Sequence, residues 1–291
     1  MKRFALLAAF LVAACGSFGV AQPHPLSLAY KAGDTYKYKF HATTKQTANM
    51  TGMSVPIQLD TSANETVTVK SVDSSGTADL TITLSDLTLK SVTGGITNTT
   101  TGIPSNSVDV KIKADGTVVS IDGSSMTAGS PLAAFSGLGG GFFIAAVLPD
   151  HAVKVGDSWS KTYDQSDPNG LGTVHITSTS KYLRDETVNN VTTAVVETKS
   201  DGKLDFSGEG ANTNSAVRGF SMHGTFTTDV TTWIDTSGHR IVKSHANGHD
   251  DVTLNFPTMS PPSTDKTTPT APIMQGPITA TGDSTSDLSP A

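Results

Sequence analysis

The sequence predicts an all-β, mainly antiparallel protein made of two similar β repeats, either curved sheets or half-barrels. Three observations lead to this prediction. Apolar and polar residues alternate along many short runs, turn-forming pairs separate these runs, and one start motif occurs twice. Short connections between alternating runs favour antiparallel meanders over the crossover helices that parallel strands need.

The alternation has the period of a β-strand. Tyr36, Tyr38 and Phe40 are separated by charged or polar residues, and the same pattern runs through 78–84, 108–112 and 252–256. Successive side chains of a strand point to opposite faces, so each run predicts a strand with one apolar and one solvated face. The abundant threonine and valine suit such a half-buried, pleated surface.

Turn-forming pairs lie between or beside these runs: Ser75-Gly76, Asp115-Gly116, Asp122-Gly123, Asp201-Gly202, Ser237-Gly238 and Asn247-Gly248. Asn-Gly and Asp-Gly are the strongest two-residue hairpin signals because both residues tolerate positive φ. A hairpin at Asn247-Gly248 would pair His245 with Asp250 and place His245 and His249 on opposite faces.

The repeat is visible in a start motif. Lys31-Ala32-Gly33-Asp34-Thr35-Tyr36 reappears as Lys154-Val155-Gly156-Asp157-Ser158-Trp159, at an offset of 123 positions. Gly with Asp favours a turn that leads into a strand. Ile112 and Gly116 recur as Ile234 and Gly238 at an offset of 122. We therefore expect one repeat over 26–128 and a second over 149–256.

The first residues predict export. Lys2 and Arg3 precede an uncharged apolar run from Phe4 to Ala14, which is typical of a secretory signal peptide. Two cleavage sites are open: a lipobox would end the signal at residue 14 and lipidate Cys15, whereas cleavage after Ala21 would give a signal over 1–21. The expected location is the periplasm or the cell envelope.

Composition excludes several classes of partner and site. Cys15 is the only cysteine, so the exported chain forms no internal disulfide. The formal net charge is −6 and there is no basic stripe, which argues against nucleic acid and against anionic membrane surfaces. We expect contact with a membrane only through a lipid anchor, and no cofactor.

Two segments break the alternation. Residues 129–148 carry no charge and include Gly139-Gly140-Gly141; we expect an apolar connector between the repeats, with Ser130 and Pro131 as a candidate helix start. Residues 257–291 contain seven of the 14 prolines among serine, threonine and glycine. Such a composition buries little apolar area, so we expect a disordered tail.

No motif predicts catalysis, a metal site or a bound cofactor. The chain has no Gly-x-Ser-x-Gly elbow and no phosphate-binding loop, and the His245–Asp251 cluster is better explained as a solvated hairpin. The remaining candidate site is apolar. Aromatic side chains could line a cavity between curved sheets, and the candidates are Tyr36, Phe142, Phe143, Trp159 and Trp233.

The start motifs, with Leu148-Pro149-Asp150 leading into Val153 to Trp159, resemble those of the domain-of-unknown-function 6263 family. These are bacterial exported proteins, often classed as lipoproteins. The resemblance follows 26–256 in rhythm but only these motifs in residues, and it implies export without implying an activity. In architecture alone, the prediction is also similar to half-barrel carriers that move lipids across the periplasm.

These observations predict a non-enzymatic module that binds or scaffolds in the cell envelope. Its partner would be an envelope protein or a hydrophobic small molecule. One alternative is a periplasmic carrier with a cavity for a lipid or another apolar ligand. The other is a hydrolase whose site the sequence does not reveal.

Overall fold

The computed structural model describes residues 23–50, 52–122, 146–166, 172–207, 221–255 and 277–291. All of its regular structure is β-strand. The strands are β1 (Thr35–Met50), β2 (Met53–Val72), β3 (Ala78–Thr93), β4 (Ile96–Ile103), β5 (Asn106–Ile112), β6 (Val118–Asp122), β7 (Ser158–Ser166), β8 (Gly172–Val188), β9 (Val191–Ser207), β10 (Ser221–Asp235), β11 (Ile241–Asn255) and β12 (Ile278–Pro290).

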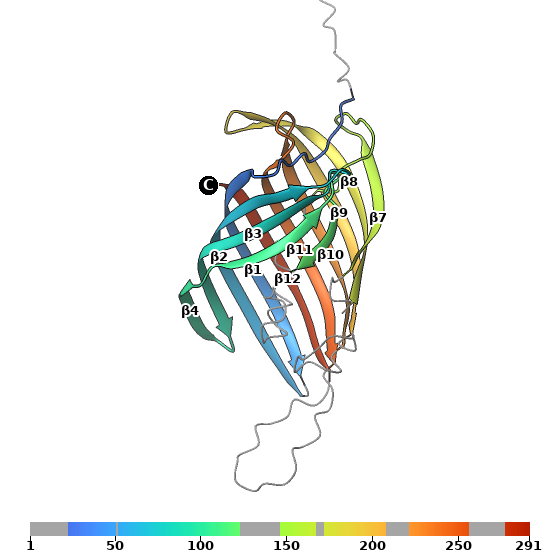
Figure 1. Cartoon of the computed structure of the whole chain (residues 1–291). Helices are drawn as coiled ribbons and strands as arrows, with labels where there is room; N and C mark the ends of the chain where they lie inside the picture. Colours follow the sequence, from blue (N-terminus) through green and yellow to red (C-terminus); the bar gives the residue numbers. More distant parts are fainter. Residues whose placement is uncertain (1–22, 51, 123–145, 167–171, 208–220, 256–276) are drawn as a thin grey trace, which may run out of the picture.

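The strands form one antiparallel sheet in the order β6-β5-β3-β2-β1-β12-β11-β10-β9-β8-β7. The remaining strand, β4, pairs with the C-terminal half of β3. The sheet curls into a nearly closed, barrel-like shape (Figure 1). The all-β, antiparallel prediction is therefore confirmed. The described residues form a single continuous sheet, however, and not two separate β units.

The pairing order explains the long connection in the middle of the chain. Every neighbouring pair along the path is antiparallel, so β6 and β7, at its two ends, run in the same direction. Strands that run the same way cannot be joined by a tight hairpin. The predicted helix in this connection lies outside the described residues, which begin again at Ala146 with buried Ala146, Val147 and Leu148.

The prediction of a disordered tail is wrong for residues 278–290, because they form β12 between β1 and β11. Inward side chains such as Ala280, Ser284 and Ser286 are small, and outward ones are polar. A strand that bonds to neighbours on both sides satisfies its backbone groups without large apolar side chains. Residues 256–276 lie outside the described part of the chain.

Two predicted turns are also wrong. Asp201-Gly202 and Asn247-Gly248 lie inside β9 and β11. A Cβ at Gly202 would come within 2.1 Å of the Phe226 ring, and one at Gly248 within 2.8 Å of the Ser284 Oγ. Here glycine makes room for a neighbouring side chain and does not turn the backbone.

Other predicted turns are confirmed. Ser75-Gly76 joins β2 to β3 and Asp115-Gly116 joins β5 to β6, with φ of +83° and +80° at the two glycines. Ser237-Gly238 lies between β10 and β11.

Among the described residues, no helix is long and apolar enough to cross a membrane.

The core lies on the inner face in layers. Residues 23–30 cross one end of the sheet, which we call the upper end. The largest apolar cluster fills this end and includes Leu28, Leu80, Val110, Tyr182 and Ile234. A second apolar cluster at the other end includes Val174, Leu204, Met222 and Leu254. Between them lies a layer of small or polar inward residues, among them Thr44, Ser178, Ser200 and Ser286.

Candidate functional site: a tyrosine-lined pocket with a buried carboxyl group

The N-terminal segment 23–30 closes the upper end of the sheet (Figure 1). His24 forms a bridge with Val153, the Leu28 N–H donates to the Ala114 carbonyl at 2.7 Å, and the Ala29 N–H donates to the His239 carbonyl at 2.8 Å. These bonds tie the segment to three separate connections of the sheet. The segment leads directly into Tyr30, which lines a pocket beneath it.

The two start motifs adopt the same turn. Gly33 and Gly156 have φ of +91° and +97°, a conformation that glycine reaches without strain. The Gly33 N–H donates to the Val69 carbonyl at 2.9 Å, and the Gly156 N–H donates to the Tyr182 carbonyl at 2.8 Å. Each turn thus anchors the start of a strand to its neighbour, and the first one places Tyr36 and Tyr38 at the pocket.

The pocket has a volume of about 90 Å³. A cavity of about 150 Å³ accepts benzene in another protein, so this one accepts a group somewhat smaller than benzene. Three tyrosines, Tyr30, Tyr36 and Tyr38, contribute to its wall together with aliphatic residues of β3, β5 and β6, among them Leu80, Val110 and Val118. The wall is therefore aromatic on one side and aliphatic on the other.

Glu65 is the buried charged group of this pocket. It follows the inward phase of β2, in which Ala63, Val67 and Val69 are also buried, and its side chain lies between Tyr38 of β1 and Leu84 of β3 in register. Glu65 is only 6 % exposed, and no described residue donates a hydrogen bond to it or forms an ion pair with it. Burial raises the pKa of this carboxyl group to about 7.

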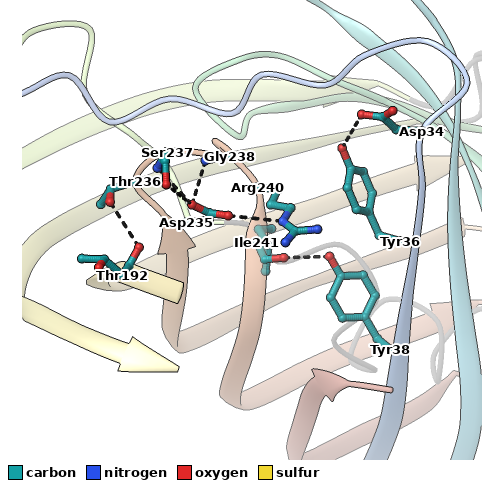
Figure 2. Close-up of polar contacts among 10 residues, drawn as sticks. All are labelled: Asp34, Tyr36, Tyr38, Thr192, Asp235, Thr236, Ser237, Gly238, Arg240 and Ile241. Atoms are coloured by element: carbon teal, nitrogen blue, oxygen red, sulfur yellow. Dashed lines mark hydrogen bonds and ion pairs between the residues drawn. The ribbon is translucent and has the colours of Figure 1, made fainter. Parts of the chain in front are cut away.

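The tyrosines are held by their hydroxyl groups. The Tyr38 hydroxyl donates to the Ile241 carbonyl at 2.7 Å, and the Tyr36 hydroxyl donates to the Asp34 carboxylate at 3.1 Å (Figure 2). Burial raises the phenol pKa of both Tyr30 and Tyr38, so the rings stay neutral at physiological pH. The Tyr30 and Tyr36 ring centroids are 6.1 Å apart and tilted by 58°.

A positive side chain lies beside the pocket but is already paired. The Arg240 guanidinium lies over the Tyr36 ring, 5.7 Å from its centroid, and its Nε is 3.4 Å from the Asp235 carboxylate. Asp235 also accepts backbone hydrogen bonds from Ser237 and Gly238 in the β10–β11 turn (Figure 2). Arg240 is not part of the pocket wall, so it leaves the charge of Glu65 without a partner.

A second carboxyl group is buried on the inner face, in the middle of the sheet. Asp250 is 7 % exposed and accepts a hydrogen bond from the Gln46 amide at 3.1 Å. Gly282 of β12 lies between them in register, and a Cβ there would come within 2.3 Å of the Gln46 Cγ. Gly282 thus leaves the space through which Gln46 reaches across a strand. Burial raises the pKa of Asp250 to about 6, and this hydrogen bond opposes the shift.

The structure places the predicted lining residues in different environments. Tyr36 lines the pocket. Trp159 is buried in the upper core, where its indole N–H donates to the Val147 carbonyl at 2.7 Å. Trp233 follows the outward phase of β10, with the Lys243 ammonium 3.9 Å from its ring centroid. Phe142, Phe143 and Cys15 lie outside the described residues.

Sequence reasoning missed Glu65 as a site residue, although a signal for it exists. The run Ala63-Asn64-Glu65-Thr66-Val67-Thr68-Val69 alternates, and Glu65 occupies a position of the apolar phase. An acid in that phase is a buried polar group that requires a partner. Tyr30 was missed because it lies in an irregular segment before the first strand.

No histidine is among the wall residues of the pocket. His245 and His249 both face outward and pair with Asp287 and Asp283 of β12 at 2.7 and 2.8 Å. The predicted His245–Asp250 pair is therefore wrong, because the hairpin on which it depended is a continuous strand. Within the described residues, no three His, Cys, Asp or Glu side chains are grouped so that they could hold a metal ion.

Comparison with known proteins does not place the chain in a family. No family model matches the chain, so the resemblance to the 6263 family depends on the start motifs alone. No curated protein matches it either. A solved structure of a DUF1329 family protein from Desulfovibrio piger is similar over 88 % of this chain and 86 % of that chain, with 9 % identity. Its TM-score is 0.17, which is too low to support an argument about fold or function.

Proposed function

We propose that this chain is an exported, non-enzymatic binding protein that holds part of a small molecule in the upper pocket. The observation that carries the proposal is an aromatic and aliphatic pocket of about 90 Å³ with a buried, unpartnered carboxyl group. A mostly apolar cavity with a few placed polar groups is typical of a ligand site. The volume suits a small molecule or one end of a larger one, such as an amphiphile.

Binding is favoured over catalysis by the distribution of reactive groups. None of the eight histidines of the chain is in the pocket wall, and six of them contact aspartate carboxylates instead. The other acid among the wall residues, Asp287, occupies an outward position of β12 and pairs with His245, so it does not supply Glu65 with a second acid inside the pocket. General acid–base catalysis needs such a partner within hydrogen-bond reach, so the hydrolase alternative has less support.

Ligand binding is tested with a small neutral alcohol, 3,3-dimethylbutan-1-ol. Its addition to the isotope-labelled protein is expected to shift the ring resonances of Tyr30, Tyr36 and Tyr38 in an NMR titration. Ile82→Phe, which enlarges a wall residue, is expected to weaken these shifts while the protein keeps its cooperative unfolding. Shifts spread over the outer face would contradict the proposal, and so would the absence of shifts with both this alcohol and choline.

Scaffolding of an envelope protein is a second candidate, and β4 is the observation that favours it. Among the described strands β4 pairs only with β3, and seven of its eight residues are exposed. An unpaired strand edge is a typical surface for adding a partner strand. A photo-crosslinker at Ile96, which is 67 % exposed, should capture a partner in the host cell, whereas one at Val155, 40 % exposed, should not.

We also propose that the two start motifs mark a duplication. Each precedes a meander of neighbouring strands that proceeds the same way around the sheet, β1 to β6 and β7 to β11. Because β6 and β7 run in the same direction, the first strands of both meanders also do.

We also propose that the chain is exported and carries a lipid anchor at Cys15. The mass of the protein, purified from host membranes and measured under denaturing conditions, tests both. Acylated Cys15 would support the anchor, and a chain beginning at Gln22 would support a free protein.

A further inference from the structure

The pocket also carries information about the chemistry of its ligand. We propose that the Glu65 pocket binds an alkylated ammonium group, with the Glu65 carboxylate opposite the positive charge and the tyrosine rings around it. This inference rests on the proposed function, because it names the ligand class of the same site. It follows from the charge balance of the pocket, the nature of its wall and its size.

The charge balance is the first step. Only 6 % of the Glu65 surface is exposed, and no described residue supplies its carboxyl group with a hydrogen-bond donor or a cation. A buried carboxylate without a partner is costly, and an opposite charge within a few ångströms removes most of that cost. The nearest cationic side chain named above, Arg240, is outside the wall and paired with Asp235. A ligand cation would therefore supply the missing partner, whereas an anion would be repelled.

The wall is the second step. Neutral aromatic rings attract cations through their faces, and cages of such rings recognise quaternary ammonium groups. Tyr30 and Tyr36 lie 6.1 Å apart at one side of the pocket, and Tyr38 and Phe40 complete that side. The chain already uses the Tyr36 ring in this way, because Arg240 lies over it at 5.7 Å.

The small number of hydrogen-bond acceptors in the wall favours an alkylated over an unsubstituted ammonium group. A primary ammonium has three N–H donors that all need acceptors. The Tyr36 and Tyr38 hydroxyl groups donate to Asp34 and Ile241 and keep an oxygen that can accept, but most of the wall residues are aliphatic or aromatic and offer few acceptors. Methyl groups on the nitrogen replace donors with apolar surface that suits this wall. A trimethylammonium group is also smaller than benzene, as the volume of about 90 Å³ requires.

The test compares choline with 3,3-dimethylbutan-1-ol, in which carbon replaces the charged nitrogen at nearly the same shape. Binding of both to the full chain is measured by calorimetry and NMR at pH 8, where Glu65 is ionised. Wild type is expected to bind choline at least ten-fold more tightly than the alcohol. Glu65→Gln is expected to lose this preference and bind the two compounds about equally.

Three variants control for general effects. Asp250→Asn neutralises another buried carboxyl group and is expected to leave choline affinity within two-fold of wild type. Tyr36→Leu removes a ring and is expected to weaken choline more than the alcohol, and Tyr36→Phe should restore most of the difference. These ratios compare two ligands in one variant, so a general loss of stability does not imitate them.

The outcomes separate this inference from the proposed function. If the alcohol binds and choline does not, or if Glu65→Gln keeps the preference for choline, the pocket binds apolar groups and the ammonium inference is wrong. If neither compound binds, the proposed function itself fails. A preference for choline that depends on Glu65 supports both.

An alkylated ammonium group can come from a free molecule or from a lipid headgroup, and a vesicle experiment distinguishes these sources. Co-sedimentation with phosphatidylcholine vesicles but not with phosphatidylglycerol vesicles, lost in Glu65→Gln, would support the inference with a lipid as the source. Choline binding without such sedimentation would support it with a free molecule as the source.

Discussion

Two carboxyl groups, Glu65 and Asp250, are buried to almost the same extent on the inner face of one sheet, at 6 % and 7 % exposure. Their surroundings differ. Asp250 accepts a hydrogen bond from Gln46, which reaches it across Gly282. Glu65 lies at the edge of a pocket with tyrosine and aliphatic neighbours and no donor among the described residues.

The difference shows that burial alone does not identify a ligand site. Burial raises the pKa of both carboxyl groups, so acidity does not separate them either. What separates them is the partner: the chain supplies one for Asp250 and leaves that of Glu65 to be supplied from outside. We therefore assign Asp250 a structural role and Glu65 a binding role. Three changes test this division, and a fourth on the outer face gives the scale of a solvent-exposed contact.

The largest effect is expected for Gly282→Val. A Cβ at this position would lie 2.3 Å from the Gln46 Cγ and 2.6 Å from the Lys45 carbonyl oxygen, and backbone cannot move aside easily within a paired strand. We expect a loss of about 3 kcal/mol in the free energy of unfolding, as for strong overpacking, measured by urea denaturation. Thr281→Val, on the exposed face of the same strand, should change it by less than about 0.5 kcal/mol.

Glu65→Gln should stabilise the protein at pH 8. The folded pKa of about 7 lies above the ordinary value of 4.5, so the unfolded chain releases this proton first and wild-type stability falls as pH rises from about 4.5 past 7. Removal of the charge should recover on the order of 2–3 kcal/mol at pH 8. Equal stability of variant and wild type across this range, in thermal or urea unfolding, would contradict a buried, unpartnered Glu65.

Gln46→Leu tests the partner of Asp250. The substitution removes the donor and leaves a buried carboxyl group unsatisfied, which costs about 1–3 kcal/mol. We expect the lower end of this range, because Asp250 can take up a proton as its pKa rises further. Choline affinity should not change. A loss of affinity would show that the two carboxyl groups belong to one site.

The smallest effect is expected on the outer face. The carboxylate of Asp283 raises the pKa of His249, so this pair stabilises the fold below the ordinary histidine pKa and the contribution disappears as pH rises through the folded value. The His249 side chain is 49 % exposed and that of Asp283 80 %, and solvent screening keeps such contributions below about 0.5 kcal/mol. His249→Asn should lower stability slightly at pH 5 and leave it unchanged at pH 8.

The fold class was predictable because alternation and turn residues are local signals. Tyr36, Tyr38 and Phe40 show the period of two directly, and Gly76 and Gly116 occupy turns as predicted. β12 was not predictable from local signals, because Ser284 and Ser286 face inward while being polar. Its stability comes from pairing with β1 and β11, which are distant in sequence.

The glycines show the same limit. Gly202 and Gly248 lie in dipeptides typical of hairpins, but they make room for Phe226 and Ser284 from neighbouring strands. Only the three-dimensional register separates a glycine that turns the chain from one that accepts a side chain. For the site, the phase of Glu65 within β2 was readable from the sequence, whereas the approach of Tyr30 over the pocket depends on bonds to Ala114 and His239.

The most direct test of the account is the pKa of Glu65 itself, followed by ¹³C NMR of the side-chain carboxyl and assigned by comparison with Glu65→Gln. Tyr30 and Tyr38 stay neutral across the titration, and the signal that is absent from Glu65→Gln reports Glu65. We predict a pKa of about 7 in the free protein and a marked decrease when choline is present, because a cation favours the ionised form. A pKa near 4.5 in the free protein, or one that choline leaves unchanged, would contradict the assignment of Glu65 to ligand binding.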